Sequence, residues 1–155
     1  MKNQKGFTLI ELLVVIAIIG LLSTLAVVSL NNARQKARDA KRVADVRQIQ
    51  TALELYFNEH NAYPLMAVGD VLGLESIAGF STYMADVPAN PSPQAEDYGG
   101  TSNCPGEDYQ YESCTADGTT CNATVDGASY YITYCLSGTT GNLNGGKHIA
   151  TPAGM

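Results

Sequence analysis

The chain has 155 residues, a net charge of −6 and four cysteines. Its length leaves room for one small domain beside any membrane segment. The acidic balance argues against nucleic acid as the main partner, because proteins that bind phosphate backbones need clustered positive charge.

An apolar stretch occupies residues 7–30 and contains one charged side chain, Glu11. As a helix, this stretch is long enough to cross the roughly 30 Å hydrocarbon core of a membrane. A carboxylate in lipid costs about 2.5–3.5 kcal/mol on insertion scales, so we expect Glu11 to have a functional partner. A secretory signal peptide has a shorter apolar core and an Ala-x-Ala-like site, and a plain single-pass anchor leaves Glu11 unexplained.

Residues 1–6 form a short leader that carries Lys2 and Lys5 and ends in a small residue, Gly6. The segment Gly6-Phe7-Thr8-Leu9-Ile10-Glu11 resembles, without a mismatch, the cleavage motif of type IV prepilins and type II secretion pseudopilins. The resemblance implies that a membrane prepilin peptidase cuts between Gly6 and Phe7 on the cytoplasmic side. It also implies that the same enzyme N-methylates Phe7.

Cleavage would create a cationic amine on Phe7, one helical turn from the Glu11 carboxylate. Both charges would then lie in apolar surroundings. The amine of a neighbouring subunit is a natural partner for Glu11, and burial of this pair would set the register of one subunit against the next. Phe7, Thr8 and Glu11 are therefore the predicted assembly residues.

Residues 7–60 contain no proline and only one glycine, Gly20, which predicts a single long helix. Its second half, residues 31–61, is amphipathic and should pack on the rest of the chain. Many pilins have a proline where this sequence has Val28, so a continuous helix is expected. The predicted apolar stripe consists of Val43, Val46, Ile49, Leu53, Tyr56 and Phe57. The charged residues between Arg38 and Arg47 can form i,i+3 and i,i+4 pairs, and they are predicted to form a solvated face.

Basic residues cluster directly after the apolar stretch, at Arg34, Lys36, Arg38, Lys41 and Arg42. The positive-inside rule alone would place this cluster in the cytoplasm. The cysteines and the leader favour the opposite orientation, with the leader in the cytoplasm. The cluster could also contact anionic lipid headgroups, or acidic partners on other subunits.

Residues 62–155 are predicted to form one globular domain. Pro64 excludes Tyr63 from the helix, so the helix should end just before them. Antiparallel strands are expected around residues 109–111, 119–125 and 128–136, and brief helical turns within residues 70–74 and 76–84. The tail from Gly138 onward is expected to be a surface loop or a loosely held end. The predicted fold class is α+β, with a long N-terminal helix packed on a small antiparallel sheet in a pilin-like arrangement.

Two disulfides in an oxidising compartment are the preferred interpretation of the cysteines, Cys104, Cys114, Cys121 and Cys135. Three pairings are possible, and Cys104–Cys121 with Cys114–Cys135 is weakly favoured. Their spacing lacks the paired clusters of a zinc site. A calcium loop built from Asp117, Asp126, Asn142 and Asn144 would be too sparse to claim, so neither metal nor cofactor is predicted.

No catalytic motif is present, so the sequence predicts a substrate of the peptidase rather than an enzyme. The resemblance implies a structural subunit of a type IV pilus. The precursor would lie in the cytoplasmic membrane, surrounded by lipid, and the product in a filament on the cell surface. Its partners would be further copies of itself, the peptidase, and the assembly platform with its ATPase. A type II secretion pseudopilin in a periplasmic piston, and a minor or DNA-uptake pilin, are the alternatives.

Overall fold

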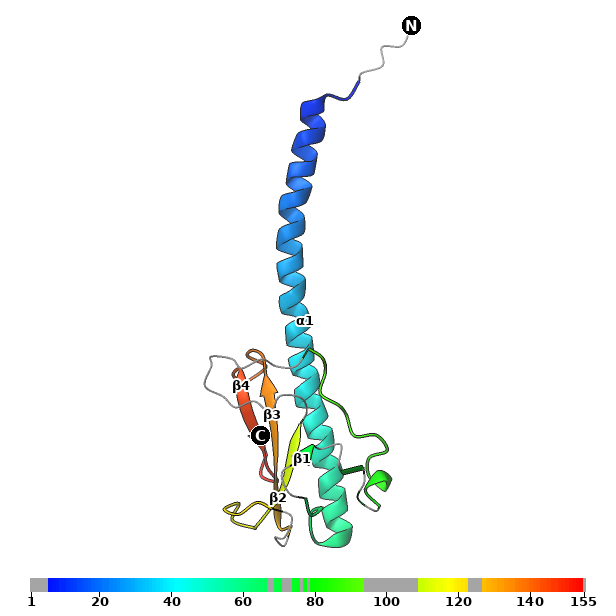
Figure 1. Ribbon diagram of the computed structural model, residues 1–155, viewed down its shortest axis with the longest axis vertical. Coiled ribbons are helices and arrows are strands. Elements are labelled where there is room, and N and C mark those ends of the chain that lie inside the picture. The colour runs from blue at the N-terminus through cyan, green and yellow to red at the C-terminus, as the bar shows by residue number, and fades with distance from the viewer. Residues whose placement is uncertain are drawn as a thin grey trace. The chain divides into compact units, whose positions relative to one another are not determined.

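A computed structural model describes residues 6–66, 69–70, 74–75, 77, 79–93, 109–122 and 127–154. The chain divides into two compact units, Met1–Gln35 and Lys36–Met155. The helix α1 (Leu9–His60) begins in the first unit and continues into the second. The long helix predicted from the sequence is thus confirmed, and Figure 1 shows it as one uninterrupted element.

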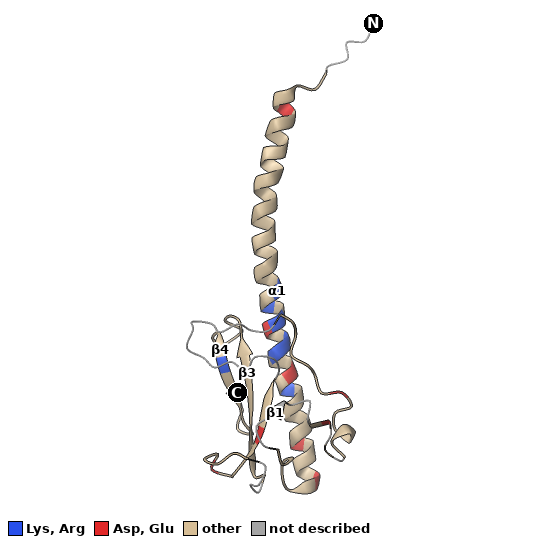
Figure 2. Cartoon of the chain, in the orientation of Figure 1, with Lys and Arg blue, Asp and Glu red and all other residues tan. Residues whose placement is uncertain are grey.

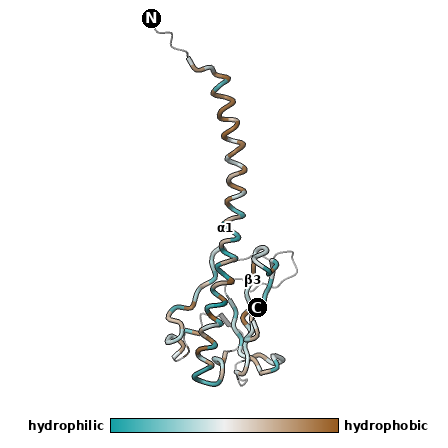
Figure 3. Tube along the Cα trace, turned by 180° about the vertical axis from the view of Figure 1, so that it is seen from behind, coloured by the Kyte–Doolittle hydropathy of each residue, from teal (hydrophilic) through white to brown (hydrophobic). Residues whose placement is uncertain are grey.

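In the first unit every large apolar side chain of α1 is exposed. Leu9 is 79% exposed and Ile10 is 73% exposed. Figure 3 shows this part of α1 as an almost unbroken hydrophobic stretch. By length and composition, α1 is the one helix in the described part of the chain that could cross a membrane. These side chains need an apolar environment that this unit does not itself supply, because exposing them to water would be costly.

The second unit contains a four-stranded antiparallel sheet with the strand order β1-β2-β3-β4. β1 (Gly69–Asp70) is very short, and the other strands are β2 (Gln110–Cys114), β3 (Ser129–Leu136) and β4 (Gly146–Ala150). Tyr111 pairs with Ile132 across β2 and β3, and Ile132 pairs with Ala150 across β3 and β4. The predicted strands around residues 109–111 and 128–136 are confirmed.

The core of the second unit lies between the later part of α1 and one face of the sheet. Val46, Ile49 and Leu53 are fully buried on the helix, and every second residue of β3 contributes to the same cluster. Full burial of one such aliphatic side chain stabilises the fold by about 1.5–3 kcal/mol. Val43, Tyr56 and Phe57 pack around the edge of the cluster, so the apolar stripe predicted from the sequence is confirmed.

The end of α1 is held against the sheet by the segment that follows it. Asn61 adopts a left-handed conformation, and its backbone amide donates to the Phe57 carbonyl over 2.8 Å, which closes the last turn. The next turn of chain brings Tyr63 to Gly127, where the Tyr63 amide donates to the Gly127 carbonyl over 2.7 Å. The Tyr63 hydroxyl donates to the Glu54 carboxylate over 2.9 Å. Burial, followed by the nearby Glu54 carboxylate, raises the pKa of Tyr63, so this hydroxyl stays protonated as a donor.

Two local expectations are wrong, and a third is confirmed only in part. The stretch from Thr119 to Asn122 belongs to a turn closed by an isolated bridge between Cys114 and Cys121, not to a strand. The tail is not only a surface loop, because β4 lies in it and pairs with β3. Between β1 and β2, the helical turn expected within residues 76–84 is confirmed as η2 (Phe80–Thr82), whereas of residues 70–74 Asp70 lies in strand β1 and Leu74 begins a turn with Glu75.

The expected solvated charged face is wrong for three of its members. Arg42 is fully buried, Asp39 is 1% exposed and Asp45 is 5% exposed. Asp45 accepts a hydrogen bond from the Tyr109 hydroxyl over 3.0 Å. A buried charge is costly unless it is paired or hydrogen-bonded: Asp39 and Arg42 form an ion pair, and Asp45 has the hydrogen bond from Tyr109.

Candidate processing and assembly site

The N-terminus of α1 is closed by a reciprocal pair of hydrogen bonds between Thr8 and Glu11. The Glu11 carboxylate accepts from the Thr8 amide over 2.8 Å and from the Thr8 hydroxyl over 2.6 Å. The Thr8 hydroxyl in turn accepts from the Glu11 amide over 3.3 Å. This is a capping box, in which a threonine before the helix and a glutamate three residues later satisfy each other's backbone amides. The helix therefore starts at Leu9, two residues later than the apolar stretch.

The cap holds the carboxylate in a defined position and leaves part of it free. All the described bonds use Oε2, and Oε1 of Glu11 has no hydrogen-bond partner among the described residues. A carboxylate oxygen has two acceptor sites, so a further cationic donor can bind here while the cap remains intact. This cap was not among the features expected from the sequence, although the Thr-x-x-Glu pattern before an apolar run is its usual signature.

The predicted cleavage point lies just outside the helix. Gly6, Phe7 and Thr8 are exposed and have no helical structure, and a methyl group added at Gly6 would meet no atom within 4 Å. A peptidase must hold its substrate in an extended form, so a non-helical Gly6–Phe7 bond is accessible without unfolding the helix. The leader residues before Gly6 lie outside the described residues.

The cysteines lie in the second unit, away from the processing motif in sequence. Cys114 and Cys121 form a disulfide, and Cys135 is disulfide-bonded as well, to a partner outside the described residues. Cys104 also lies outside them. The weakly favoured pairing of Cys104 with Cys121 and of Cys114 with Cys135 is therefore wrong. The physical reason is that the turn after β2 reverses the chain and brings Cys121 back beside Cys114 as a cross-strand pair.

Asp117 organises the turn that this disulfide closes. Its carboxylate accepts from the Thr115 hydroxyl over 2.5 Å, from the Thr119 amide over 3.1 Å and from the Thr119 hydroxyl over 2.9 Å. The hydrogen bond from Thr115, followed by those from Thr119, lowers the pKa of Asp117. This carboxylate thus has a structural role within its own turn.

The other candidate ligands are dispersed. Within the described ranges, no group of three histidine, cysteine, aspartate or glutamate side chains is placed to hold a metal ion. Of the sparse calcium pattern, Asp126 lies outside the described residues. His60 stacks on Tyr56 with ring centroids 4.0 Å apart, and its Nδ1 lies 3.1 Å from the Tyr56 carbonyl.

Comparison with known proteins identifies relatives of two kinds. Residues 1–27 match the family model described as "Prokaryotic N-terminal methylation motif". The chain is 34% identical over 124 residues to "Type II secretion system core protein G" of Vibrio cholerae, which covers 77% of each chain. It is 40% identical over 68 residues to the protein of the same name from Aeromonas hydrophila, covering 44% of this chain and 48% of the relative.

A third relative is a pilus protein. The chain is 38% identical over 84 residues to "Type IV wide pilus major component PilA4" of Thermus thermophilus, covering 54% of this chain and 64% of the relative. No solved structure matches. Three findings agree: Glu11 caps the start of an exposed apolar helix, residues 1–27 match the methylation motif, and the match to the Vibrio cholerae protein covers most of that protein. This chain therefore belongs to the type IV pilin and type II secretion pseudopilin family.

Proposed function

We propose that this chain is made as a prepilin, cut between Gly6 and Phe7, methylated on Phe7 and assembled into a type IV pilus. One observation carries the proposal. The exposed apolar part of α1 opens on a Glu11 carboxylate that is held by Thr8 and still has Oε1 available. A helix of this kind requires lipid or other helices around it, and its carboxylate requires a cation.

Processing would supply that cation. Removal of residues 1–6 gives Phe7 a free amine, which is an ammonium at neutral pH and stays charged after methylation. Within one subunit, the Phe7 amine would lie next to the start of the helix, which Thr8 and Glu11 already cap. The amine of a neighbouring subunit could instead bind the free oxygen of Glu11, which would pair charges between successive subunits.

Assembly would exchange one apolar environment for another. In the membrane, the side chains of residues 7–30 contact lipid, and in a filament they contact the same stretch of other subunits. The carboxylate costs about 2.5–3.5 kcal/mol in lipid, and that cost is offset when the ion pair forms. The filament would therefore be favoured specifically by cleaved subunits in the correct register.

Other partners and locations follow from this proposal. The precursor would be a single-pass protein of the cytoplasmic membrane, and the product a filament on the cell surface. Besides further copies of itself, its partners would be the prepilin peptidase and methylase, and an assembly platform driven by an ATPase. A disulfide-bonded globular unit suits a filament in an oxidising environment.

A type II secretion pseudopilin is the second candidate function. It is favoured by the Vibrio cholerae relative, whose match covers more of this chain than the match to the Thermus pilus protein. In that case the same processing and helix packing would build a short periplasmic piston rather than a surface filament.

Electron microscopy of material sheared from the cell surface, with mass spectrometry of its N-terminal peptide, separates these functions. We expect long filaments whose subunits begin at a methylated Phe7. Processed chains found only in the envelope fraction would identify the pseudopilin, and chains that still begin at Met1 would refute both. Gly6→Leu serves as the control for processing, because a bulky residue at the cut should leave the leader attached.

A further inference from the structure

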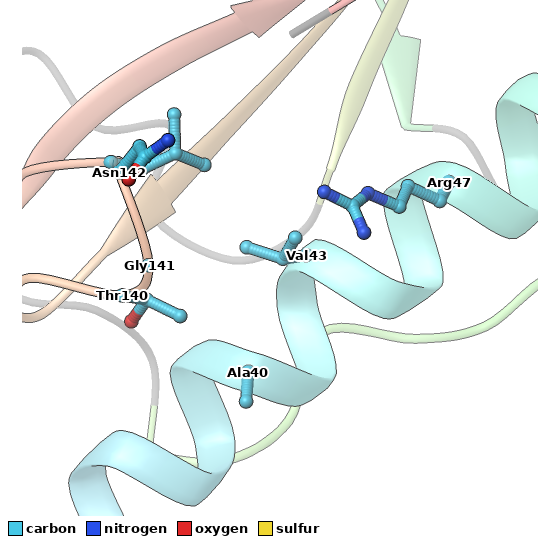
Figure 4. A pocket seen from close by; sticks show the side chains of 7 residues that line it. Ala40, Val43, Arg47, Thr140, Gly141 and Asn142 are labelled. Carbon is cyan, nitrogen blue, oxygen red and sulfur yellow. The ribbon is translucent and has the colours of Figure 1, made fainter.

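A groove in the second unit lies between α1 and the turn that joins β3 to β4. Its volume is about 540 Å³. Figure 4 shows Arg47 extending from α1 above Val43, on the side where the turn lies. The groove is lined by Ala40, Val43 and Arg47 from the helix and by Thr140, Gly141, Asn142 and Leu143 from the turn.

The turn is a tight hairpin with a defined shape. The Thr140 amide donates to the Leu143 carbonyl over 2.8 Å, and the Leu143 amide donates back to the Thr140 carbonyl over 3.1 Å. Gly141 adopts the left-handed conformation at the first central position, with φ of 60°. The wall opposite α1 is therefore formed by a regular turn, with Thr140 and Asn142 held beside the groove.

The main polar group in the groove is a hydrogen-bond donor that has no acceptor bound to it among the described residues. The guanidinium of Arg47 is exposed and has no hydrogen bond or ion pair within the described ranges. The buried hydroxyl oxygen of Thr140 likewise has no partner there. Arg47 offers five N–H donors, and the Asn142 side chain, which also lines the groove, adds an amide donor. This chemistry fits a carboxylate, which a guanidinium can bind through two parallel hydrogen bonds.

The globular unit is itself a source of carboxylates. From Ala62 onward the sequence has ten acidic residues and one basic residue, Lys147. Figure 2 shows that the other described basic residues lie on α1. Contacts between successive globular units would therefore be favoured where the basic side of α1 on one copy meets an acidic surface on the next.

Among the described residues, Asp86 is an exposed acid that is available for such a contact. It is exposed and has no hydrogen bond or ion pair within the described part of the chain. The other exposed acids of its neighbourhood are engaged, since Glu75 accepts from the Val87 amide and Glu59 from the Tyr83 hydroxyl. Figures 1 and 3 show residues 79–93 on one side of α1 and the strands on the other.

We propose that the groove at Arg47 receives the Asp86 carboxylate of a second copy of this chain. The two halves of the contact lie on opposite sides of α1, so the interface joins two different surfaces. A contact of this kind repeats from copy to copy and gives a polymer when it does not close into a ring. The proposal rests on the filament function above, and it assigns the contact between globular units that accompanies helix packing.

Charge reversal tests the proposal in the full-length chain. Arg47→Glu would place two carboxylates together, and Asp86→Arg would place two guanidinium groups together. We expect each change to lower the yield of sheared filaments at least about tenfold, because like charges at an interface are strongly unfavourable. The double variant with both changes restores opposite charges, and its yield should return to within about threefold of the unchanged chain.

Matched controls separate this contact from general charge effects. Lys41→Glu makes the same change on an exposed residue of α1 that does not line the groove, and Glu112→Arg makes the Asp86 change on β2. Both should leave the yield near that of the unchanged chain. Retention of the Cys114–Cys121 disulfide and of the thermal midpoint shows that each variant folds. If Arg47→Glu does not fold, Arg47→Gln removes the same charge with a milder change, and its yield decides instead.

The outcomes distinguish this contact from the filament function. Normal filaments from Arg47→Glu, or no recovery in the double variant, would overturn the contact and leave the filament function standing. Absence of filaments from the unchanged chain would overturn both. Loss in the single variants with recovery in the double variant supports the contact between copies and excludes an unrelated anionic ligand.

Discussion

Asp39 and Arg42 form a buried ion pair of 2.6 Å one turn apart on α1, and together they bind two distant parts of the chain. Arg42 donates to the side chain of Asn90 and to the carbonyls of Pro91 and Pro93 over 2.8–3.0 Å. Asp39 accepts from the backbone amides of Ser137 and Gly138, each over 3.0 Å. The pair therefore fastens the segment between β1 and β2, and the residues just after β3, to the same turn of the helix.

Arg42→Met should be strongly destabilising. It removes the cation and leaves the Asp39 carboxylate as an uncompensated buried charge, which typically costs about 3–5 kcal/mol. Lys41→Met is the matched control, because Lys41 is exposed one position earlier and surface changes usually stay within about 0.5 kcal/mol. Urea unfolding of the full chain in detergent, followed by circular dichroism, measures both. Equal stability of the two variants would contradict the role assigned to this pair.

Gly127→Ala should destabilise the chain more than the same change at Gly141. Both glycines have positive φ, 64° at Gly127 and 60° at Gly141, so each alanine pays a left-handed backbone cost of about 1–2 kcal/mol. The new methyl at Gly127 would also lie 2.6 Å from the Tyr63 carbonyl oxygen, whereas at Gly141 nothing lies within 4 Å. Thermal unfolding of the two variants isolates the clash, and a smaller loss at Gly127 would show that the Tyr63 segment moves freely.

Removing the Cys114–Cys121 disulfide should cost about 2.5 kcal/mol. The bridge closes a loop with a sequence separation of seven, and the chain-entropy relation for a loop of that size gives this value. The paired substitution to serine avoids leaving a free thiol, and chemical unfolding measures the loss. Peptide mapping under non-reducing conditions checks the pairing directly. A peptide that joins Cys104 to Cys121 would refute it.

Asp117 should make the turn sensitive to acid. Its hydrogen bonds from Thr115 and Thr119 lower its pKa in the folded chain below the ordinary value of 3.8. The stabilisation is therefore complete above the ordinary pKa and is lost as the pH falls through the lower, folded value. An NMR titration of the side-chain carboxyl reports the folded pKa. Asp117→Asn should abolish this part of the acid dependence, and an Asp117 that titrates at or above 3.8 would show that the hydrogen bonds are absent in solution.

Changes at Glu11 and Thr8 should separate capping from subunit pairing. Glu11→Gln keeps an oxygen that can accept from Thr8 but removes the charge, so we expect normal membrane insertion and cleavage with a loss of filaments. Thr8→Val removes the hydroxyl and weakens the cap by about 1 kcal/mol, but it keeps the carboxylate, so filaments should persist at reduced yield. Quantitative microscopy of sheared filaments compares them. Normal yield from Glu11→Gln would remove the ion pair from the account of assembly.

Much of this fold follows from local patterns. The absence of proline over residues 7–60 and the spacing of Val46, Ile49 and Leu53 predict a helix with a buried stripe, and both are present. The resemblance at Gly6 to Glu11 predicts the family, which the comparisons confirm. These predictions need no tertiary information, because helix periodicity and a contiguous motif depend only on residues that are close in sequence.

The errors occur where partners come from far along the chain. In the sequence, Arg42 is one charge among several on an amphipathic helix. Its burial depends on carbonyl groups about 50 residues later in the chain. β4 contains glycine, lysine and alanine, which are depleted in strands, and it becomes a strand because β3 offers it an edge to pair with. The disulfide pairing depends on the path of a turn, which cysteine spacing cannot specify.

By itself, the sequence determined a long apolar helix, a cleavage motif with a charged residue near its start, and a small disulfide-bonded α+β domain. Only the tertiary structure decided that Asp39 and Arg42 are buried, and that Arg47 lines a groove beside the turn at residues 140–143. The physical reason is that covalent order sets local conformation, whereas the environment of a charge depends on which distant groups the folded chain brings within a few ångströms of it.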